Sequence, residues 1–180
     1  IAFTATSVYA VVLWSIKAAN KYFDAQVVDV FRQMSTHDGV LNYKSNQRTW
    51  GRDTWRYSSP DDDRRPTHYA LDYRVVLHHY SAIFKGGFGE FEYPGGLHNS
   101  AHEVIDDLVA VFSNLGFPTR GAGSRVRVWR ANAWQDFTNG SGDVVFQVKA
   151  FQNGNLHFRF DQNAIKAFNI EAGRLLGWIR

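Results

Sequence analysis

The segment 151–160, FQNGNLHFRF, contains an Asn-Gly pair between two runs in which apolar and polar residues alternate. Asn-Gly in this setting is the strongest short-range sign of a β-hairpin, because both residues tolerate the positive φ that tight reversals need. A hairpin fixes one strand pairing of the fold. It therefore also fixes which side chains share each face of a sheet.

The register of this hairpin follows from the pairing that keeps apolar side chains together. A two-residue turn at Asn153-Gly154 would place Lys149 opposite Phe158 and mix charge with aromatic rings on one face. A three-residue loop, with Gly154 in a left-handed bulge, makes one face wholly apolar. We therefore predict the bulged register, which opposes Ala150 to Leu156, Val148 to Phe158 and Phe146 to Phe160.

The other face of the hairpin is polar and partly cationic. It is either a solvated face or a ligand-binding surface, since antiparallel sheets commonly leave one side in water. Asn153 and Gly154 are explained by turn geometry, whereas Asn155 and His157 are not needed for packing, so these two are the leading functional candidates. The face carries Gln147, Lys149, Phe151, Asn155, His157 and Arg159.

The composition is that of one folded domain. A chain of 180 residues with 44% hydrophobic content can bury one sizeable core, so we expect a single domain over 1–180, which can be a segment of a longer protein. The absence of cysteine excludes a disulfide framework, a thiolate nucleophile and a cysteine zinc site. Residues 1–16 fall short of the roughly 18 apolar residues of a membrane span and have no basic segment before them. We expect a cytoplasmic protein with no membrane partner.

Hydrophobic periodicity predicts helices at the N-terminus, in the middle and at the C-terminus. Two helices are expected to open the chain, one over Val8 to Ala19 and a second capped by Asp24. Another runs from Asn99 or Ser100 to Leu115, and the last is capped by Asp161. Strands are expected at 69–79, at 125–130 and through the hairpin over 143–160. This order indicates an α+β domain with a mainly antiparallel sheet.

Histidines give only weak signs of chemistry. His98, His102 and Asp106 are spaced so that a helix could bring them to one face, but a bare HxxxH specifies a metal site loosely. Solvent-side histidines on an amphipathic helix are the favoured interpretation. We predict neither a metal site nor a cofactor.

Arginine and tryptophan lie close together in several stretches, and the net charge is +3. Arginine beside aromatic rings suits phosphate pairing and base stacking. On the strand expected at 125–130, Arg125, Arg127 and Trp129 share one face, so the arginines could hold phosphates while Trp129 stacks a base. Trp50 is a second stacking candidate. A solvated edge strand protected by charge explains the same pattern equally well.

Four short motifs extend this interpretation. They are Phe31-x-x-Met34-Ser35, Tyr43-Lys44-Ser45-Asn46, Asp106-Asp107-Leu108 at the end of an aspartate-rich helix, and Phe151-x-Asn153-Gly154-Asn155-Leu156-His157-x-x-Phe160. Together they resemble, over roughly residues 24–168, the bacterial and phage family called domain of unknown function four-nine-four-two. The resemblance implies a phage, plasmid or genome-defence setting, often beside or fused to a DNA adenine methyltransferase. It also draws attention to Lys44 and Asn46.

Three functional hypotheses result. The leading one is a nucleic-acid-binding domain, most simply DNA-binding, that contacts its ligand through Lys44, Asn46, Arg125, Arg127, Trp129, Lys149, Asn155, His157 and Arg159. The second is an enzyme acting on nucleic acid or a nucleotide, with His157 as general acid or base and Lys44 stabilising negative charge. The third is a protein-interaction module that docks on a methyltransferase.

Overall fold

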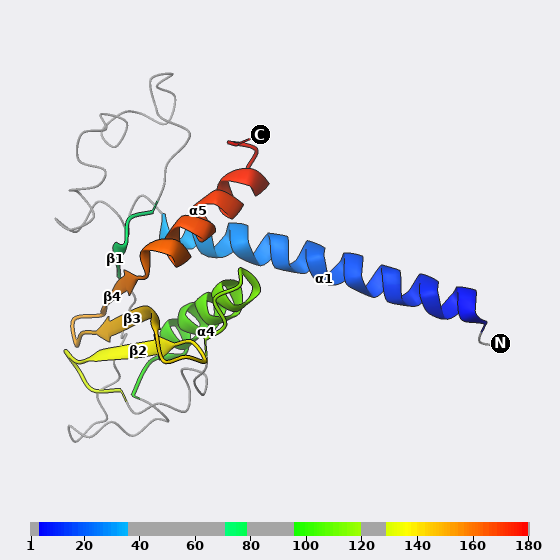
Figure 1. Ribbon diagram of the computed structural model, residues 1–180. Helices are drawn as coiled ribbons and strands as arrows, with labels where there is room; N and C mark the ends of the chain where they lie inside the picture. The colour runs from blue at the N-terminus through cyan, green and yellow to red at the C-terminus, as the bar shows by residue number, and fades with distance from the viewer. Residues whose placement is uncertain (1–3, 36–70, 79–95, 120–128, 180) are drawn as a thin grey trace.

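A computed structural model describes residues 4–35, 71–78, 96–119 and 129–179 of the chain (Figure 1). These residues form an α+β fold with helices near the N-terminus, in the middle and near the C-terminus, as predicted. In chain order the elements are α1 (Ala5–Met34), β1 (Arg74–His78), α4 (Asn99–Asn114), β2 (Trp134–Thr138), β3 (Val144–Ala150), β4 (Asn155–Phe160) and α5 (Gln162–Leu175).

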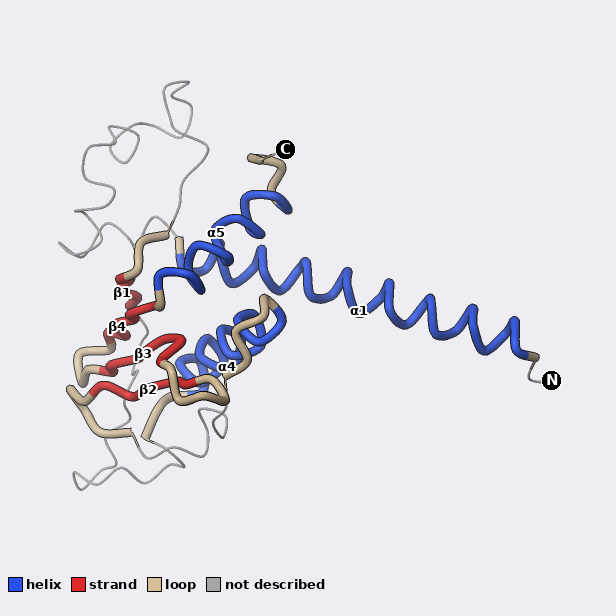
Figure 2. Tube along the Cα trace, in the orientation of Figure 1, coloured by secondary structure: helices blue, strands red, loops and turns tan. Residues whose placement is uncertain are grey.

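The four strands form one antiparallel sheet in the order β1-β4-β3-β2. Figure 2 shows α4 and α5 alongside the strands, and α1 packs against both of these helices. Phe112 of α4 joins the layers, because its ring centroid lies 5.6 Å from those of Phe146 and Phe160 and 5.8 Å from that of Phe168. The core therefore lies between the helices and one face of the sheet.

The hairpin between β3 and β4 has the predicted bulged register. Its opposed pairs are Phe146 with Phe160, Val148 with Phe158 and Ala150 with Leu156. All six side chains are buried. Gly154 has φ of 91°, and the backbone N–H of Phe151 donates to the Asn155 carbonyl at 2.9 Å. Burial of the apolar face thus selects the loop length, as the sequence argument required.

A second hairpin, between β2 and β3, was not predicted. Its turn is organised by Asn139, whose side-chain oxygen accepts backbone hydrogen bonds from Ser141 and Asp143, each at 2.9 Å. In this part of the chain the strand begins at Trp134. The prediction of a strand at 125–130 is wrong for Trp129 and Arg130, which precede β2, while 125–128 lie outside the described residues.

The prediction of two opening helices is wrong, since α1 is continuous from Ala5 to Met34. Thr4 caps it and exchanges capping hydrogen bonds with Ser7. No glycine or proline lies between Ala19 and Asp24, so nothing ends the first helix, and Asp24 sits inside it.

The other two helices follow the prediction closely. α4 begins at Asn99 after the N-cap His98, and α5 begins after Asp161. The Asp161 carboxylate accepts hydrogen bonds from the backbone of Asn163 at 2.9 Å and Ala164 at 3.0 Å. This cap holds α5 directly at the end of β4, which positions the sheet against the helices.

Candidate functional site

The face of the sheet turned away from the core is called here the outer sheet face. Alternate residues of a strand point to opposite faces, so the buried pairs of β3 and β4 assign their neighbours to the outer side. Strand pairing then brings residues of all four strands into rows. The first row is Arg74, Arg159, Gln147 and Asp136; the second is Val76, His157, Lys149 and Trp134; Asn155 and His78 follow, with Phe151 beside them.

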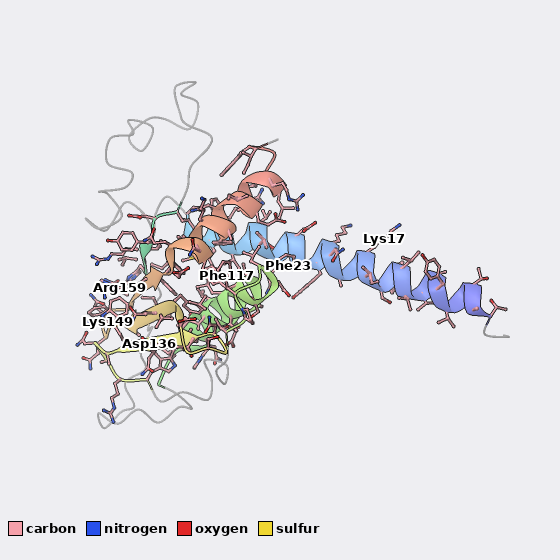
Figure 3. The ribbon with its side chains drawn as sticks, viewed as in Figure 1. Lys17, Phe23, Phe117, Asp136, Lys149 and Arg159 are labelled. Atoms are coloured by element: carbon pink, nitrogen blue, oxygen red, sulfur yellow. The ribbon has the colours of Figure 1, made fainter. Side chains whose placement is uncertain are left out.

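Cations lie over aromatic rings at the centre of this face. The Arg159 guanidinium carbon is 4.2 Å from the centroid of the Trp134 ring. Lys149 Nζ is 5.8 Å from the same ring and 5.0 Å from that of Phe151. Each distance is within the range of a cation–π attraction. Figure 3 shows Lys149 and Arg159 together at the sheet end of the molecule, far from the start of α1.

The two central cations are not neutralised within the described part of the chain. The ion pair found there joins Arg174 to Glu171 on α5, and neither Lys149 nor Arg159 contacts a carboxylate. Asp136, at the edge of the face, accepts a hydrogen bond from Gln147 Nε2 at 2.7 Å. Within the described residues, the positive charges of Lys149 and Arg159 therefore have no carboxylate partner.

His157 lies among these groups in its neutral form. Partial burial lowers the pKa of His157, and the positive charges of Lys149 and Arg159 lower it further. Its ring centroid is 4.4 Å from that of Phe151. At neutral pH this imidazole therefore offers a flat ring and hydrogen-bonding nitrogens, not a phosphate-binding charge. The neutral form is also the one that a general base needs, so an enzymatic role for His157 stays a prediction.

Asn155 differs from the prediction of a freely projecting amide. It belongs to the outer side, but its side chain is buried, with 8% of the residue exposed. Its Oδ1 lies 3.0 Å from Nδ1 of His78 on the neighbouring strand. The amide is thus engaged in joining β4 to β1 through His78.

The prediction that Trp129 stacks a nucleic-acid base does not fit the structure. Trp129 is fully buried and its ring centroid lies 6.4 Å from that of Phe137. Phe137 in turn stacks on Phe146, with centroids 4.4 Å apart. Trp129 is therefore a core residue, because a large aromatic side chain gains most by burial.

Five other candidates lie outside the described residues: Lys44, Asn46, Trp50, Arg125 and Arg127. The structure adds five residues that were not predicted for this face: Arg74, Val76, His78, Trp134 and Asp136. The Asn139-Gly140 pair was the available signal for Trp134, because it marks the turn that pairs β2 with β3. Of the predicted residues, the structure brings together Lys149, Asn155, His157 and Arg159.

The described segments contain no group of three or more His, Asp or Glu residues arranged to hold a metal ion. None of their helices has the length and apolar character needed to cross a membrane.

The chain belongs to the family described as Domain of unknown function (DUF4942), whose profile matches residues 1–178. This confirms the family resemblance seen in the motifs. No curated protein and no solved structure matches the chain.

Proposed function

We propose that the outer sheet face binds nucleic acid, and that it favours a single strand whose bases are unstacked. The observation that carries the proposal is the layer of Arg159 and Lys149 over Trp134, without a carboxylate partner in the described residues. Phosphates would pair with the cations while bases stack on the flat groups.

The Arg159–Trp134 pair suits stacking even though the guanidinium already covers one side of the ring. A guanidinium is itself planar and delocalised, and bases stack on it as they do on aromatic rings. The ligand's base would add a third layer to this pair. Phe151 and the neutral His157 ring supply a second flat surface, 4.4 Å apart at their centroids.

The spacing of the cations supports a backbone that crosses the strands. Arg74 and Arg159 are direct cross-strand partners, and Lys149 lies in the adjacent row. Neighbouring strands are about 4.8 Å apart, so the three side chains can reach successive phosphates. A sheet platform of this kind reads exposed bases, which a closed duplex does not offer.

DNA is the first ligand to test, because the family motifs imply a phage or plasmid setting beside DNA adenine methyltransferases. The hypothesis of docking on a methyltransferase stays a separate prediction.

Fluorescence anisotropy with a labelled single-stranded oligonucleotide tests the proposal. Replacing Lys149 and Arg159 together by alanine should weaken binding at least about tenfold, since each charged contact typically contributes more than 1 kcal/mol. Lys166→Ala is the matched control, because Lys166 is an exposed cation on α5, away from the strands. For the parent protein, log Kd should rise with log salt with a slope of about 2 if three phosphates are contacted.

A second titration separates stacking from charge. Trp134→Ala should weaken binding to the normal strand and leave binding to an abasic strand nearly unchanged, because only the former has bases to stack. An affinity that does not depend on salt concentration, or that is lowered equally by Lys166→Ala, would contradict the proposal.

A further inference from the structure

The first half of α1 stands clear of the rest of the protein. Figure 1 shows it projecting beyond α4 and α5, and every residue from 4 to 22 is exposed. Much of this surface is apolar: Tyr9 is 65% exposed, Leu13 38%, Trp14 70% and Ile16 52%. In proteins, most helical stability comes from packing of an apolar face.

Along the whole of α1, apolar residues follow a heptad spacing, with Asn20 as the polar exception. One set, seven residues apart, is Tyr9, Ile16, Phe23 and Val30; the other is Leu13, Asn20, Val27 and Met34. The two sets alternate by three and four residues, which places them on one side of the helix as a continuous seam. We call the side of α1 formed by these two sets the α1 seam.

The second half of the α1 seam is already an interface. Val27, Val30 and Met34 are buried, and α1 packs there against α4 and α5. Phe23 is partly buried against the core where α1 leaves the body. The exposed half thus continues a packing surface of the protein itself, in the same direction and with the same spacing.

We propose that the exposed half of the α1 seam binds the same half of a second copy of this chain, in antiparallel orientation. A parallel pair in register is disfavoured by the fold. The partner helix would have to continue along the seam beyond Phe23, where α4 and α5 already lie. The α1 helix of an antiparallel partner begins near Phe23 and runs the other way. The rest of the partner therefore lies at the opposite end of the helix pair, away from α4 and α5.

One antiparallel register makes the seam complementary to itself. It places Leu13 opposite Ile16 of the second copy, and Ile16 opposite the second copy's Leu13, as two central apolar layers. The polar members then meet at each end, with Asn20 opposite Tyr9, so that an amide faces a hydroxyl. A single polar residue at a seam position commonly fixes register in helical pairs.

The charges permit this arrangement. Lys17 and Lys21 are the charged residues between 4 and 22. Lys17 flanks the seam next to the second copy's Ala10, so no like charges meet, while Lys21 points away. Pairing about 17 residues of two helices buries on the order of 1,000 Å², the lower limit for a specific interface. We therefore expect a dimer that forms reversibly with concentration.

Sedimentation velocity over about 1–200 μM tests this dimer, a range that spans micromolar affinities. The parent chain should shift from monomer to dimer, and Leu13→Glu with Ile16→Glu should stay monomeric throughout. The control is Val11→Glu with Trp14→Glu, which adds the same charge to exposed apolar residues on the opposite side of α1. The control should dimerise like the parent.

Cysteine cross-linking tests the orientation, because the chain has no cysteine of its own. A variant with both Tyr9→Cys and Asn20→Cys should form a disulfide-linked dimer in a glutathione buffer. Either substitution alone should not, since the two equivalent cysteines would lie about 16 Å apart in the antiparallel pair, too far for a disulfide.

Four outcomes would overturn the proposal. A monomer at every concentration would show that the seam is not a self-association surface. Cross-linking by the single cysteine variants would indicate a parallel pair. Equal loss of association in both glutamate variants, or binding of the parent to lipid vesicles without dimerisation, would show general apolar adhesion instead of a specific seam.

Discussion

At the scale of single residues, protonation of His157 makes the stability of the fold depend on pH. Its pKa is lowered in the folded state by burial first and by Lys149 and Arg159 next, so unfolding restores a more basic imidazole. Between the unfolded pKa near 6.5 and the lower folded value, the unfolded chain therefore binds more protons. This proton uptake favours unfolding as the pH falls.

We accordingly expect the free energy of unfolding to fall between about pH 7 and pH 5 by more in the parent than in His157→Gln. The glutamine cannot be protonated and keeps a polar side chain of similar reach. The difference should stay below about 1.4 kcal/mol per pH unit, the limit for one proton. Urea unfolding at the two pH values measures it, and equal losses in both proteins would show that His157 is not the titrating group.

Alternation in the hairpin sequence predicted some of the side chains around His157, but not how they are engaged. Alternation along the hairpin placed Lys149, His157 and Arg159 together correctly. The burial of Asn155 and its contact with His78 depend on β1, which lies 77 positions away in sequence from Asn155. Trp129 became a core residue for a similar reason, since its packing partner belongs to a strand that was not predicted.

At the scale of elements, the turn between β3 and β4 depends on one backbone conformation. Gly154 has φ of 91°, where a Cβ atom costs roughly 1–2 kcal/mol. Gly154→Ala should lower the free energy of unfolding by about that amount, and Gly154→Asn by less, because asparagine tolerates the left-handed region. Gly140→Ala in the other hairpin turn is the control, as Gly140 is not among the residues with positive φ. Equal effects at the two glycines in chemical denaturation would contradict this assignment.

The elements that could be predicted carry strong local signals. The hairpin has strict alternation and Asn-Gly, and α5 has its aspartate cap. β2 was missed because the sequence of Trp134–Thr138, WQDFT, does not alternate clearly, and it pairs through a bulge between Phe137 and Thr138. α1 was divided because Asp24 looks like a cap, although nothing before it stops the helix.

At the scale of the whole molecule, two surfaces that differ in charge and in apolar character lie far apart. The outer sheet face is cationic and aromatic, and the exposed α1 seam is apolar and nearly uncharged; Figure 1 shows the strands at one end and the N-terminus at the other. Changes on one surface should therefore leave the other intact. In an antiparallel dimer the two sheets would lie at opposite ends.

The two halves of α1 differ in burial, and this difference gives a last prediction about the stability of the whole molecule. Leu13 and Ile16 are exposed, whereas Phe31 is fully buried, with its ring centroid 5.7 Å from that of Phe168 and 5.8 Å from that of Trp178. In the monomer, at about 1 μM where so small an interface dissociates, Leu13→Ala with Ile16→Ala should change the free energy of unfolding by less than about 0.5 kcal/mol.

Phe31→Ala should cost about 3–5 kcal/mol, because it leaves a cavity where α1 meets α5. Urea unfolding followed by tryptophan fluorescence compares the three proteins. A large loss in the Leu13/Ile16 variant at this dilution would mean that the first half of α1 contributes to the monomer's own core. In that event the seam would be an intramolecular surface, and the second copy would have no place on it.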